Sequence, residues 1–167
     1  PRWAIAAKFK AKQAESQIIG IDLQVGRTGV VTPVAKIKEV ELSGVMISSA
    51  TLHNQDEIDR KDIRINDFVL IERSGDVIPK ITQVLKNKRP QNTQKFSISD
   101  YNWPDPDCKI ERIEGEAAYR CINPNCKSRV MGVLEHFCSK NAMNIEGMGP
   151  QIVKQLFEAD LLNSFDD

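Results

Sequence analysis

Two apolar segments flank a short turn near the start of the chain. Apolar residues occupy every second position of the first segment: Ile19, Ile21, Leu23 and Val25. This period of two is typical of a strand with one buried face. Gly26 and Gly29 bound the turn, and both can adopt positive φ. The pattern predicts a β-hairpin over residues 18–25 and 30–37, with Arg27 and Thr28 at its tip.

The hairpin tip allows two interpretations. The planar guanidinium of Arg27 can donate two hydrogen bonds at once, which suits a phosphate or the edge of a groove. An ordinary solvent-exposed turn would have the same residues. The tip alone therefore does not decide whether the hairpin binds a partner.

Further strands are expected at residues 45–49, 68–73 and 77–85. A short helix is expected at 55–60, with Asn54 as its N-cap, and the turn at 74–76 makes the last two strands a hairpin. We predict a mainly β protein with some α structure. Strands in this order, with one helix after the third, fit an OB-fold β-barrel, and another small barrel is the alternative. A small cysteine ribbon and a helix-hairpin-helix segment follow the barrel.

The second half of the chain changes character. Residues 91–107 are rich in Asn, Gln, Ser, Asp and Pro, as in a linker, and a cysteine segment follows at 108–126. Helices are expected at 128–139 and 151–159. Between them, Gly147 and Gly149 could present backbone N–H groups to a DNA phosphate, or they could form a structural αα-corner. We expect divisions at 1–14 (a tail or linker), 15–96, 97–127 and 128–167. Residues 11–16 could be a short helix or linker.

Composition excludes several classes of protein. The chain has 23 basic and 23 acidic residues, so any DNA-binding face must come from local clustering. No apolar run approaches bilayer length and the N-terminus lacks a signal-peptide pattern. We therefore expect a cytoplasmic protein without membrane contact. The opening at Pro1 without methionine is typical of a fragment excised from something larger, and we expect a monomer. Four cysteines in this setting indicate metal binding or free thiols.

Four phrases, in this order and spacing, resemble the NAD-dependent DNA ligases of bacteria: Pro1–Phe9, Gln24–Ala35, Ala50–Asn54 and Arg73–Pro79. The resemblance covers the whole chain. It implies an OB-fold domain from an enzyme that seals nicks in duplex DNA during replication and repair, using NAD and Mg²⁺. It also implies that residues 1–14 close the nucleotidyltransferase domain and that residues 128–167 begin a helix-hairpin-helix domain.

The resemblance also implies roles for individual residues. Lys8 matches a lysine that faces the nucleotide phosphates. The residues that match DNA-facing positions are Arg27, Thr28, Arg73, Val77 and Ile78. An apolar pair beside an arginine suits a minor groove, although one of Val77 and Ile78 should face the strand core, because neighbouring strand residues point in opposite directions.

The nucleophilic lysine of these ligases lies in a Lys-X-Asp-Gly phrase, and this sequence contains no such phrase. We therefore expect a DNA-gripping fragment that is inactive alone, with NAD bound by upstream domains. The competing hypothesis is a stand-alone OB/zinc module that binds single strands. Against it, the barrel has only Phe68 and Phe96 as candidate stacking residues.

The cysteines pose a metal question. Cys121 and Cys126 have a spacing that zinc accepts, and the resemblance supplies two more ligands from an upstream Cys-Pro-X-Cys phrase. Here that phrase ends in Cys108 and has Asp105 in place of its first cysteine. Three interpretations stay open: zinc bound by Asp105 with the three cysteines, a fourth ligand from Cys138 or His136, or no metal. Cys138 lies beside apolar helix residues, which favours a buried core thiol.

Overall fold

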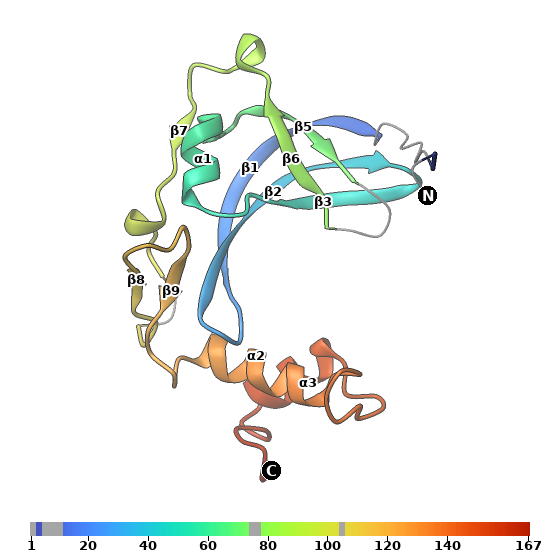
Figure 1. Ribbon diagram of the computed structural model, residues 1–167, viewed down its shortest axis with the longest axis vertical. Coiled ribbons are helices and arrows are strands. Elements are labelled where there is room, and N and C mark those ends of the chain that lie inside the picture. The colour runs from blue at the N-terminus through green and yellow to red at the C-terminus, as the bar shows by residue number, and fades with distance from the viewer. Residues whose placement is uncertain (1–2, 5–11, 74–77, 104–105) are drawn as a thin grey trace.

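The computed structural model describes residues 3–4, 12–73, 78–103 and 106–167 (Figure 1). The strands are β1 (Gln13–Val25), β2 (Val30–Leu42), β3 (Val45–Thr51), β4 (Arg64–Ile65), β5 (Phe68–Glu72), β6 (Lys80–Val84), β7 (Gln94–Lys95), β8 (Ile110–Arg112) and β9 (Tyr119–Cys121). The helices are α1 (Gln55–Lys61), α2 (Lys127–Cys138) and α3 (Pro150–Glu158), with 3-10 turns η1 (Lys86–Lys88) and η2 (Ile98–Asp100).

A closed barrel forms the first part of the molecule. Strand β1 pairs with β5 through residues 13–17 and with β2 through residues 18–25. The ring continues from β2 to β3 and from β6 to β5 by antiparallel pairing, while β3 and β6 run parallel. One strand that serves two neighbours closes a sheet without a free edge. The predicted OB-type barrel is confirmed.

The buried face of β1 differs from the simple alternation. The pairing with β2 has an irregularity between Ile18 and Gly20. Ile18 is fully buried, whereas Ile19 is 56% exposed and Ile21 is buried again. An extra residue in one strand shifts all later side chains to the other face. The expectation that Ile19 continues the buried face of Ile21 is therefore wrong.

The start of β1 also corrects an expectation. Residues 13–16 were expected to be linker or short helix, but they form a strand paired with β5, with Gln13 opposite Glu72. Ser16 is buried there, and its hydroxyl donates to the carbonyl of Lys38 at 2.5 Å. Pairing with a distant strand overrides the weak local preference of these residues.

Helix α1 closes one end of the barrel. The Asn54 side chain accepts a hydrogen bond from the backbone N–H of Glu57 at 2.9 Å, so the predicted N-cap is confirmed. Ile58 is buried against the barrel core. Asp62 ends the helix in the left-handed region with φ 51°, a conformation that aspartate tolerates better than most residues.

The polar segment after the barrel packs along its surface. Arg89 donates to both carboxylate oxygens of the fully buried Asp67, at 2.8 and 2.9 Å, and to Asp62 at 2.6 Å. Farther on, the backbone N–H of Ile98 donates to the buried side chain of Gln55 at 2.9 Å. Ile98 belongs to the predicted linker, so part of that segment is fastened to the barrel by an amide side chain.

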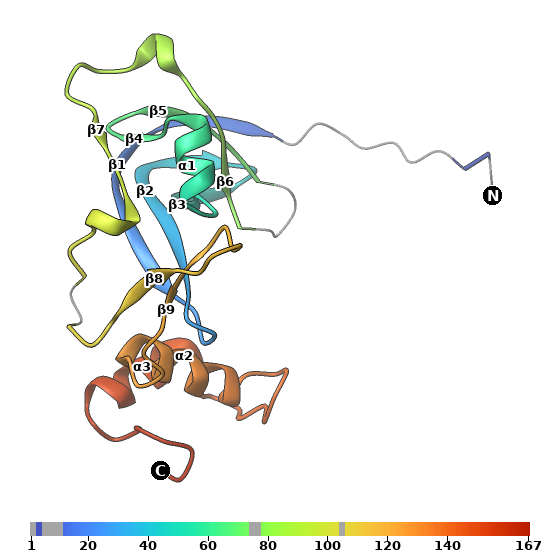
Figure 2. The same cartoon turned by 60° about the vertical axis from the view of Figure 1, so that its left-hand side comes forward.

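A small ribbon and a helix pair complete the molecule (Figure 2). Strands β8 and β9 pair with each other, and β9 extends the sheet from the lower part of β2, with Val30 opposite Arg120. Helices α2 and α3 lie within one residue of their predicted bounds and enclose Leu134, Cys138 and Val153. In the described parts of the chain, no helix has the length and apolarity needed to cross a bilayer.

Candidate nucleic-acid interface

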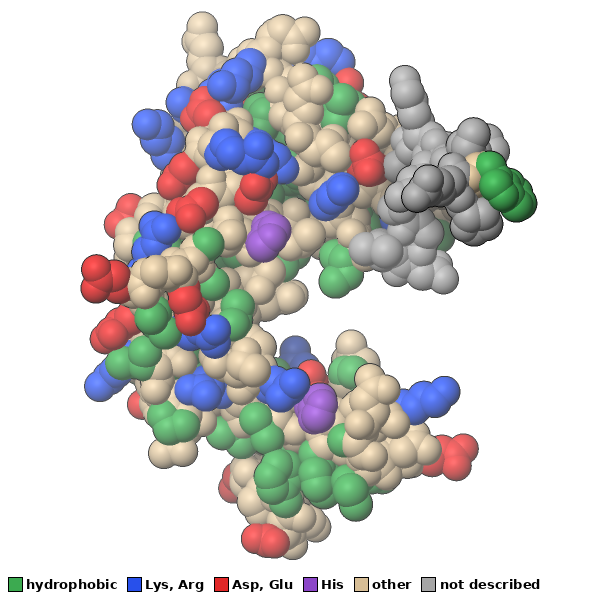
Figure 3. Space-filling model, viewed as in Figure 1, with side chains coloured by type: hydrophobic (Ala, Val, Ile, Leu, Met, Phe, Trp, Pro, Cys, Tyr) green, Lys and Arg blue, Asp and Glu red, His purple; other side chains and the backbone are tan. Residues whose placement is uncertain are grey.

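A deep hollow separates the barrel from the helix pair (Figure 3). Figure 1 shows the barrel on one side of the hollow and α2 and α3 on the other. The long β1–β2 hairpin and the ribbon connect the two sides, so that the molecule has the outline of a letter C. An open concave surface of this kind can receive a large, elongated partner.

The hairpin tip lies at the lower end of this connection, next to α2 (Figure 1). The N–H of Gly29 donates to the carbonyl of Gly26 at 2.8 Å, and the N–H of Gly26 donates to the carbonyl of Val30 at 2.9 Å. Gly29 has φ 85°, a conformation that favours glycine. Arg27 and Thr28 are both exposed between the two glycines. The tip therefore holds one cationic and one hydroxyl side chain on a closed turn.

The backbone of the tip is not free, because it contacts both the ribbon and α2. The carbonyl of Gly29 accepts a hydrogen bond from the N–H of Cys121 at 2.8 Å, and the carbonyl of Thr28 accepts one from Arg120 at 3.3 Å. On the other side, Gly132 of α2 lies against the backbone of Arg27. We call this contact the tip joint, comprising residues 27–29, 120–121, 129 and 132.

Two residues at the ends of the second predicted DNA-facing phrase, Arg73 and Ile78, are described. Arg73 directly follows β5, is half-buried and has a partner within the molecule. Ile78 precedes β6 and is 71% exposed. An isoleucine this exposed is available to press on a groove, as the minor-groove hypothesis requires. Val77 lies outside the described residues.

The glycine turn before α3 has an open backbone. Gly147 has φ 83°, and Gly149 is the N-cap of α3 without a side-chain capping hydrogen bond. Both are exposed, and no atom lies within 4 Å of a Cβ built at either position. Pro150 occupies the first turn of the helix. A phosphate could approach this turn without displacing any described side chain.

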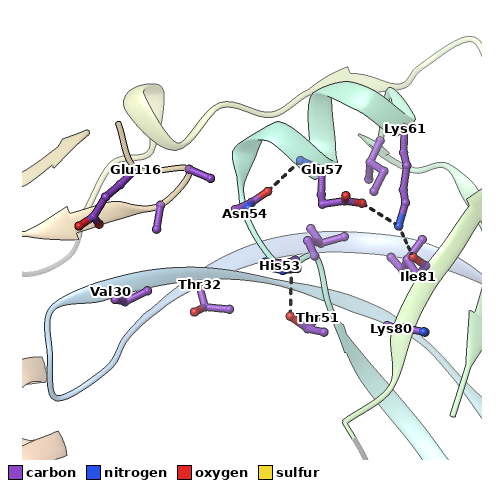
Figure 4. Close-up of a pocket in the computed structure, with 14 residues that line it drawn as sticks. Val30, Thr32, Thr51, His53, Asn54, Glu57, Lys61, Lys80, Ile81 and Glu116 are labelled. Carbon is purple, nitrogen blue, oxygen red and sulfur yellow. Dashed lines mark hydrogen bonds and ion pairs between the residues drawn. The ribbon is translucent and has the colours of Figure 1, made fainter. Parts of the chain in front are cut away.

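A groove of about 750 Å³ lies between β2, α1, β6 and the ribbon loop (Figure 4). His53 lines the groove and has φ 69°. Its backbone N–H donates to the hydroxyl of Thr51 at 3.1 Å. Lys61 spans the groove wall, bonding the carbonyl of Ile81 at 2.7 Å and Glu57 at 3.1 Å. Hydrogen bonds from Arg60 and Lys61 hold the pKa of Glu57 below its ordinary value. These partners give the groove wall a fixed ion-paired arrangement.

Three cysteines converge beside the tip joint. Cys108 precedes β8, Cys121 ends β9 and Cys126 is the N-cap of α2, and their sulfur atoms all lie within 4.8 Å of one another. Asn123 shapes the loop between the last two: its side chain donates to the carbonyl of Asp107 at 2.7 Å and accepts from the N–H of Asn125 at 3.0 Å. The sequence spacing alone did not fix this close approach.

The donor set fits a zinc ion. Burial and hydrogen bonds from the neighbouring thiols raise the pKa of Cys108, and burial raises the pKa of Cys126. Cys108 is half-buried, and Cys121 and Cys126 are buried. Thiolates this close would repel one another unless a cation compensated their charge. Zinc would be held by Cys108, Cys121 and Cys126 and would fix the ribbon to the start of α2.

A structural zinc site takes four ligands, one more than this group supplies. In the part of the chain that the structure describes, no further histidine, cysteine or carboxylate joins the three sulfurs. Cys138, as expected, is buried in the helix-pair core with Leu134 and Val153. His136 also stands outside the sulfur group, and Asp105 lies outside the described residues.

Comparison with known families identifies the barrel. The family model described as "NAD-dependent DNA ligase OB-fold domain" matches residues 15–93. Residues 15–93 are therefore similar to this OB-fold family. The match covers the closed barrel together with α1 and the segment that holds Arg89. The resemblance to NAD-dependent DNA ligases expected from the sequence is thereby confirmed.

Curated relatives extend the similarity over the whole chain. The chain is 45% identical over 167 residues to a protein named DNA ligase from Bacillus cereus (strain AH187). It is 46% identical to the DNA ligase of Lysinibacillus sphaericus (strain C3-41) and 44% to that of Bacillus thuringiensis (strain Al Hakam), again over its full length. In each case the chain spans 25% of the relative's length.

The structure brings some predicted site residues together and separates others. The three cysteines meet, and Arg27 and Thr28 share one tip, whereas Ile78 and the glycine turn lie on different parts of the molecule. Lys8 lies outside the described residues. Sequence reasoning missed Arg129 and Gly132 of the tip joint. A glycine inside an apolar helical pattern was the one available signal.

Proposed function

We propose that this chain is the DNA-gripping part of an NAD-dependent DNA ligase that seals nicks in duplex DNA during replication and repair. The observation that carries the proposal is the hollow between barrel and helix pair, which has the exposed hairpin tip beside it. The match of residues 15–93 to the ligase OB-fold family supports it. The balanced net charge of the chain makes local contacts, rather than a global field, the source of affinity.

In this proposal each residue has a role that follows from its chemistry. Arg27 and Arg73 bind backbone phosphates, and the hydroxyl of Thr28 adds a hydrogen bond. The exposed member of the pair Val77 and Ile78 presses on the minor groove, where apolar contacts read shape rather than sequence. The turn at Gly147 and Gly149 offers backbone N–H groups to a further phosphate. None of these contacts distinguishes bases, which suits an enzyme that must act at any nick.

The remaining chemistry belongs to the parent enzyme. The sequence has no Lys-X-Asp-Gly phrase, so we propose that the adenylated lysine and the NAD site lie upstream and that this chain alone is inactive. Lys8 would meet the nucleotide phosphates, and Mg²⁺ would assist the reaction. Zinc held by the three cysteines, with Asp105 as fourth ligand, would be structural. We propose a cytoplasmic monomer that associates with the bacterial nucleoid.

Salt dependence of duplex binding tests the DNA contacts. Each phosphate contact releases counterions, so the loss of one contact should make the slope of log K against log salt shallower by about 0.9. Arg27→Ala or Arg73→Ala should weaken binding to nicked duplex and flatten the slope. Ile78→Ala and Val77→Ala remove no charge and should weaken binding at an unchanged slope.

Arg60→Ala is the matched charge control. Arg60 is 68% exposed on α1 and pairs with Glu57 within the same helix, away from the proposed contacts. If Arg27→Ala and Arg73→Ala bind nicked duplex as Arg60→Ala does at low salt, the barrel is not the DNA face. The glycine turn would then be the remaining candidate.

Two further measurements separate this proposal from the stand-alone module. Labelled NAD should leave no AMP adduct on the chain and should yield no sealed product. The chain should also prefer nicked duplex to single-stranded DNA of equal length. A preference for single strands would favour the module, and an AMP adduct would overturn the proposed division of labour.

A further inference from the structure

Helix α2 carries a glycine in its interior that the proposed DNA contacts do not use. A Cβ built on Gly132 would lie 3.1 Å from the backbone nitrogen of Arg27 and 3.4 Å from its Cα. Glycine weakens a helix interior relative to alanine. Its presence here lets the backbone of the hairpin tip lie directly against the helix.

The opposite side of the tip is equally close to its neighbour. A Cβ on Gly29 would lie 2.6 Å from the carbonyl oxygen of Cys121, a distance that real Cβ atoms do not show. The carbonyl of Gly29 accepts a hydrogen bond from the N–H of Cys121 at 2.8 Å. The tip is therefore held between β9 and α2 by two backbone-to-backbone contacts. Each contact is possible only because one of its residues is a glycine, which has no side chain.

Arg129 fastens the third side of the joint. Its Nη1 donates to the carbonyl of Cys121 at 3.2 Å, and its Nε would lie 3.3 Å from a Cβ on Gly29. That Nε is buried and has no hydrogen-bond partner in the described parts of the chain. A buried donor without a partner is unfavourable, so the guanidinium is placed by its fit over Gly29 and its bond to Cys121.

We propose that the tip joint is a positioning device, with Gly29, Arg129 and Gly132 as its positioning residues. The joint sets the angle between the helix pair and the barrel, so that the hairpin tip and the turn at Gly147 can contact one duplex together. This inference rests on the proposed function. Because packed joints hold discrete arrangements rather than deforming smoothly, a small intrusion should tilt α2 away from the tip.

Gly132→Ala is the decisive variant, and Gly26→Ala is its matched control. Alanine favours the helix, so α2 should stay formed, but the new methyl meets the backbone of Arg27. At Gly26 a Cβ would lie 3.8 Å from its nearest neighbour, the Val30 carbonyl, which is ordinary contact. Both variants keep every charged side chain, so neither removes a proposed phosphate contact.

Two readouts are needed on the full chain. Donor and acceptor dyes, attached through non-canonical residues at positions 38 and 154, report the separation of β2 and α3 without DNA. Binding to nicked duplex, measured across salt concentrations, reports the affinity for DNA and its salt dependence. Gly132→Ala should shift and broaden the dye separation and weaken binding about tenfold, which corresponds to ~1.4 kcal/mol, with the salt slope unchanged. Arg129→Met should shift the separation in the same sense.

The outcomes distinguish the joint from the function. If Gly132→Ala and Arg129→Met show the dye separation of Gly26→Ala, the joint does not set the angle and the inference fails. If the separation shifts while DNA affinity stays the same, the joint sets geometry that the grip does not use, and the inference also fails. If the unaltered chain does not bind duplex at all, the proposed function fails, while the dye measurement still tests the joint.

Discussion

The barrel and the C-terminal part of this chain are stabilised in different ways. The barrel has one continuous apolar core, to which β1, β2, β3, β5, β6 and α1 all contribute. The C-terminal part has a much smaller buried cluster, formed by Leu134, Cys138 and Val153, and a ribbon whose buried members in the described region are cysteines. Small units bury too little apolar surface to fold on that basis alone.

This difference indicates which part of the molecule needs constraints beyond its own apolar core. The barrel can rely on its own packing, because closing the sheet satisfies its edges and buries its face. The ribbon and helix pair depend on additional constraints: the cysteine cluster on one side and the tip joint on the other. Cys121 belongs to both, since its sulfur lies in the cluster and its backbone bonds the hairpin tip.

Metal removal should have the largest effect and should divide the two regions. We expect purified protein to hold about one zinc per chain, as in a four-ligand structural site, and chelation to abolish protection from hydrogen exchange over residues 108–127. The barrel should keep its protection, because each unit has its own core. A ribbon equally protected before and after chelation would show that packing alone holds it.

Ligand variants sharpen this prediction. Cys121→Ser should lose zinc, and Asp105→Ala should lower zinc content if that carboxylate completes the site. Cys138→Ala is the control, because its thiol is buried in the helix pair away from the cluster. Full zinc content in Asp105→Ala, measured by atomic absorption, would place the fourth ligand elsewhere.

Truncation of the barrel core should have the next largest effect. Ile71 is fully buried in β5, and Ile71→Ala should lower the free energy of unfolding by ~2–5 kcal/mol through lost transfer energy and a cavity. The control is Val153→Ala in α3, whose parent side chain is also fully buried but loses fewer methyl groups. Hydrogen exchange should report the first change in the barrel and the second in the helix pair. Equal loss of protection in both regions would show that they unfold as one unit.

The same contrast governs what the sequence could predict. Period-two apolar segments predicted the hairpin and the barrel, because a strand with one face on the core has apolar residues at every second position. The face of Ile19 was misjudged, because a one-residue bulge leaves no mark in an alternating pattern. The hydrogen bond from Ile98 to Gln55 was missed, because a polar segment with specific partners resembles a linker in composition.

The candidate site was less predictable than the fold. The spacing of Cys121 and Cys126 indicated a metal site, but the approach of Cys108 depends on β8 pairing with β9. The tip joint had no local signature apart from Gly132, because it joins residues that lie about a hundred positions apart. Exposure of Arg27 and Ile78 agrees with their predicted roles, and those roles remain to be tested.

Acid should weaken the barrel through one of its surface anchors. Hydrogen bonds from Arg89 lower the pKa of Asp62 from 3.8 to about 2. A pKa lowered in the folded state adds stability above the unfolded-state pKa near ~3.9, and that stability is lost as pH falls toward ~2. Since the Asp62 side chain is 34% exposed, solvent screening limits the effect to about 1 kcal/mol or less.

Asp62→Asn isolates this contribution. Asparagine also tolerates the left-handed backbone at this position, so the helix end should be preserved while the charge is lost. The melting temperature of the parent should exceed that of the variant at pH 6, and the gap should narrow between pH 4 and pH 2. A gap that stays constant over this interval would exclude ionised Asp62 as its cause.

The smallest expected effect concerns a second bridge between the two regions. Arg112 of β8 donates to Asp56 of α1 at 2.8 Å, and both side chains are about half exposed, at 46% and 48%. Exposed ion pairs contribute roughly 0–1 kcal/mol, because water and salt screen them. A double-mutant cycle with Arg112→Ala and Asp56→Ala should therefore give a coupling energy within that range, smaller still at high salt.

The ring of Tyr119 lies 5.8 Å from the Arg112 guanidinium. This contact is lost in Arg112→Ala whether or not Asp56 is present, so it cancels in the double-mutant cycle. A coupling well above ~1 kcal/mol would show that charge at α1 holds the ribbon to the barrel in addition to the tip joint.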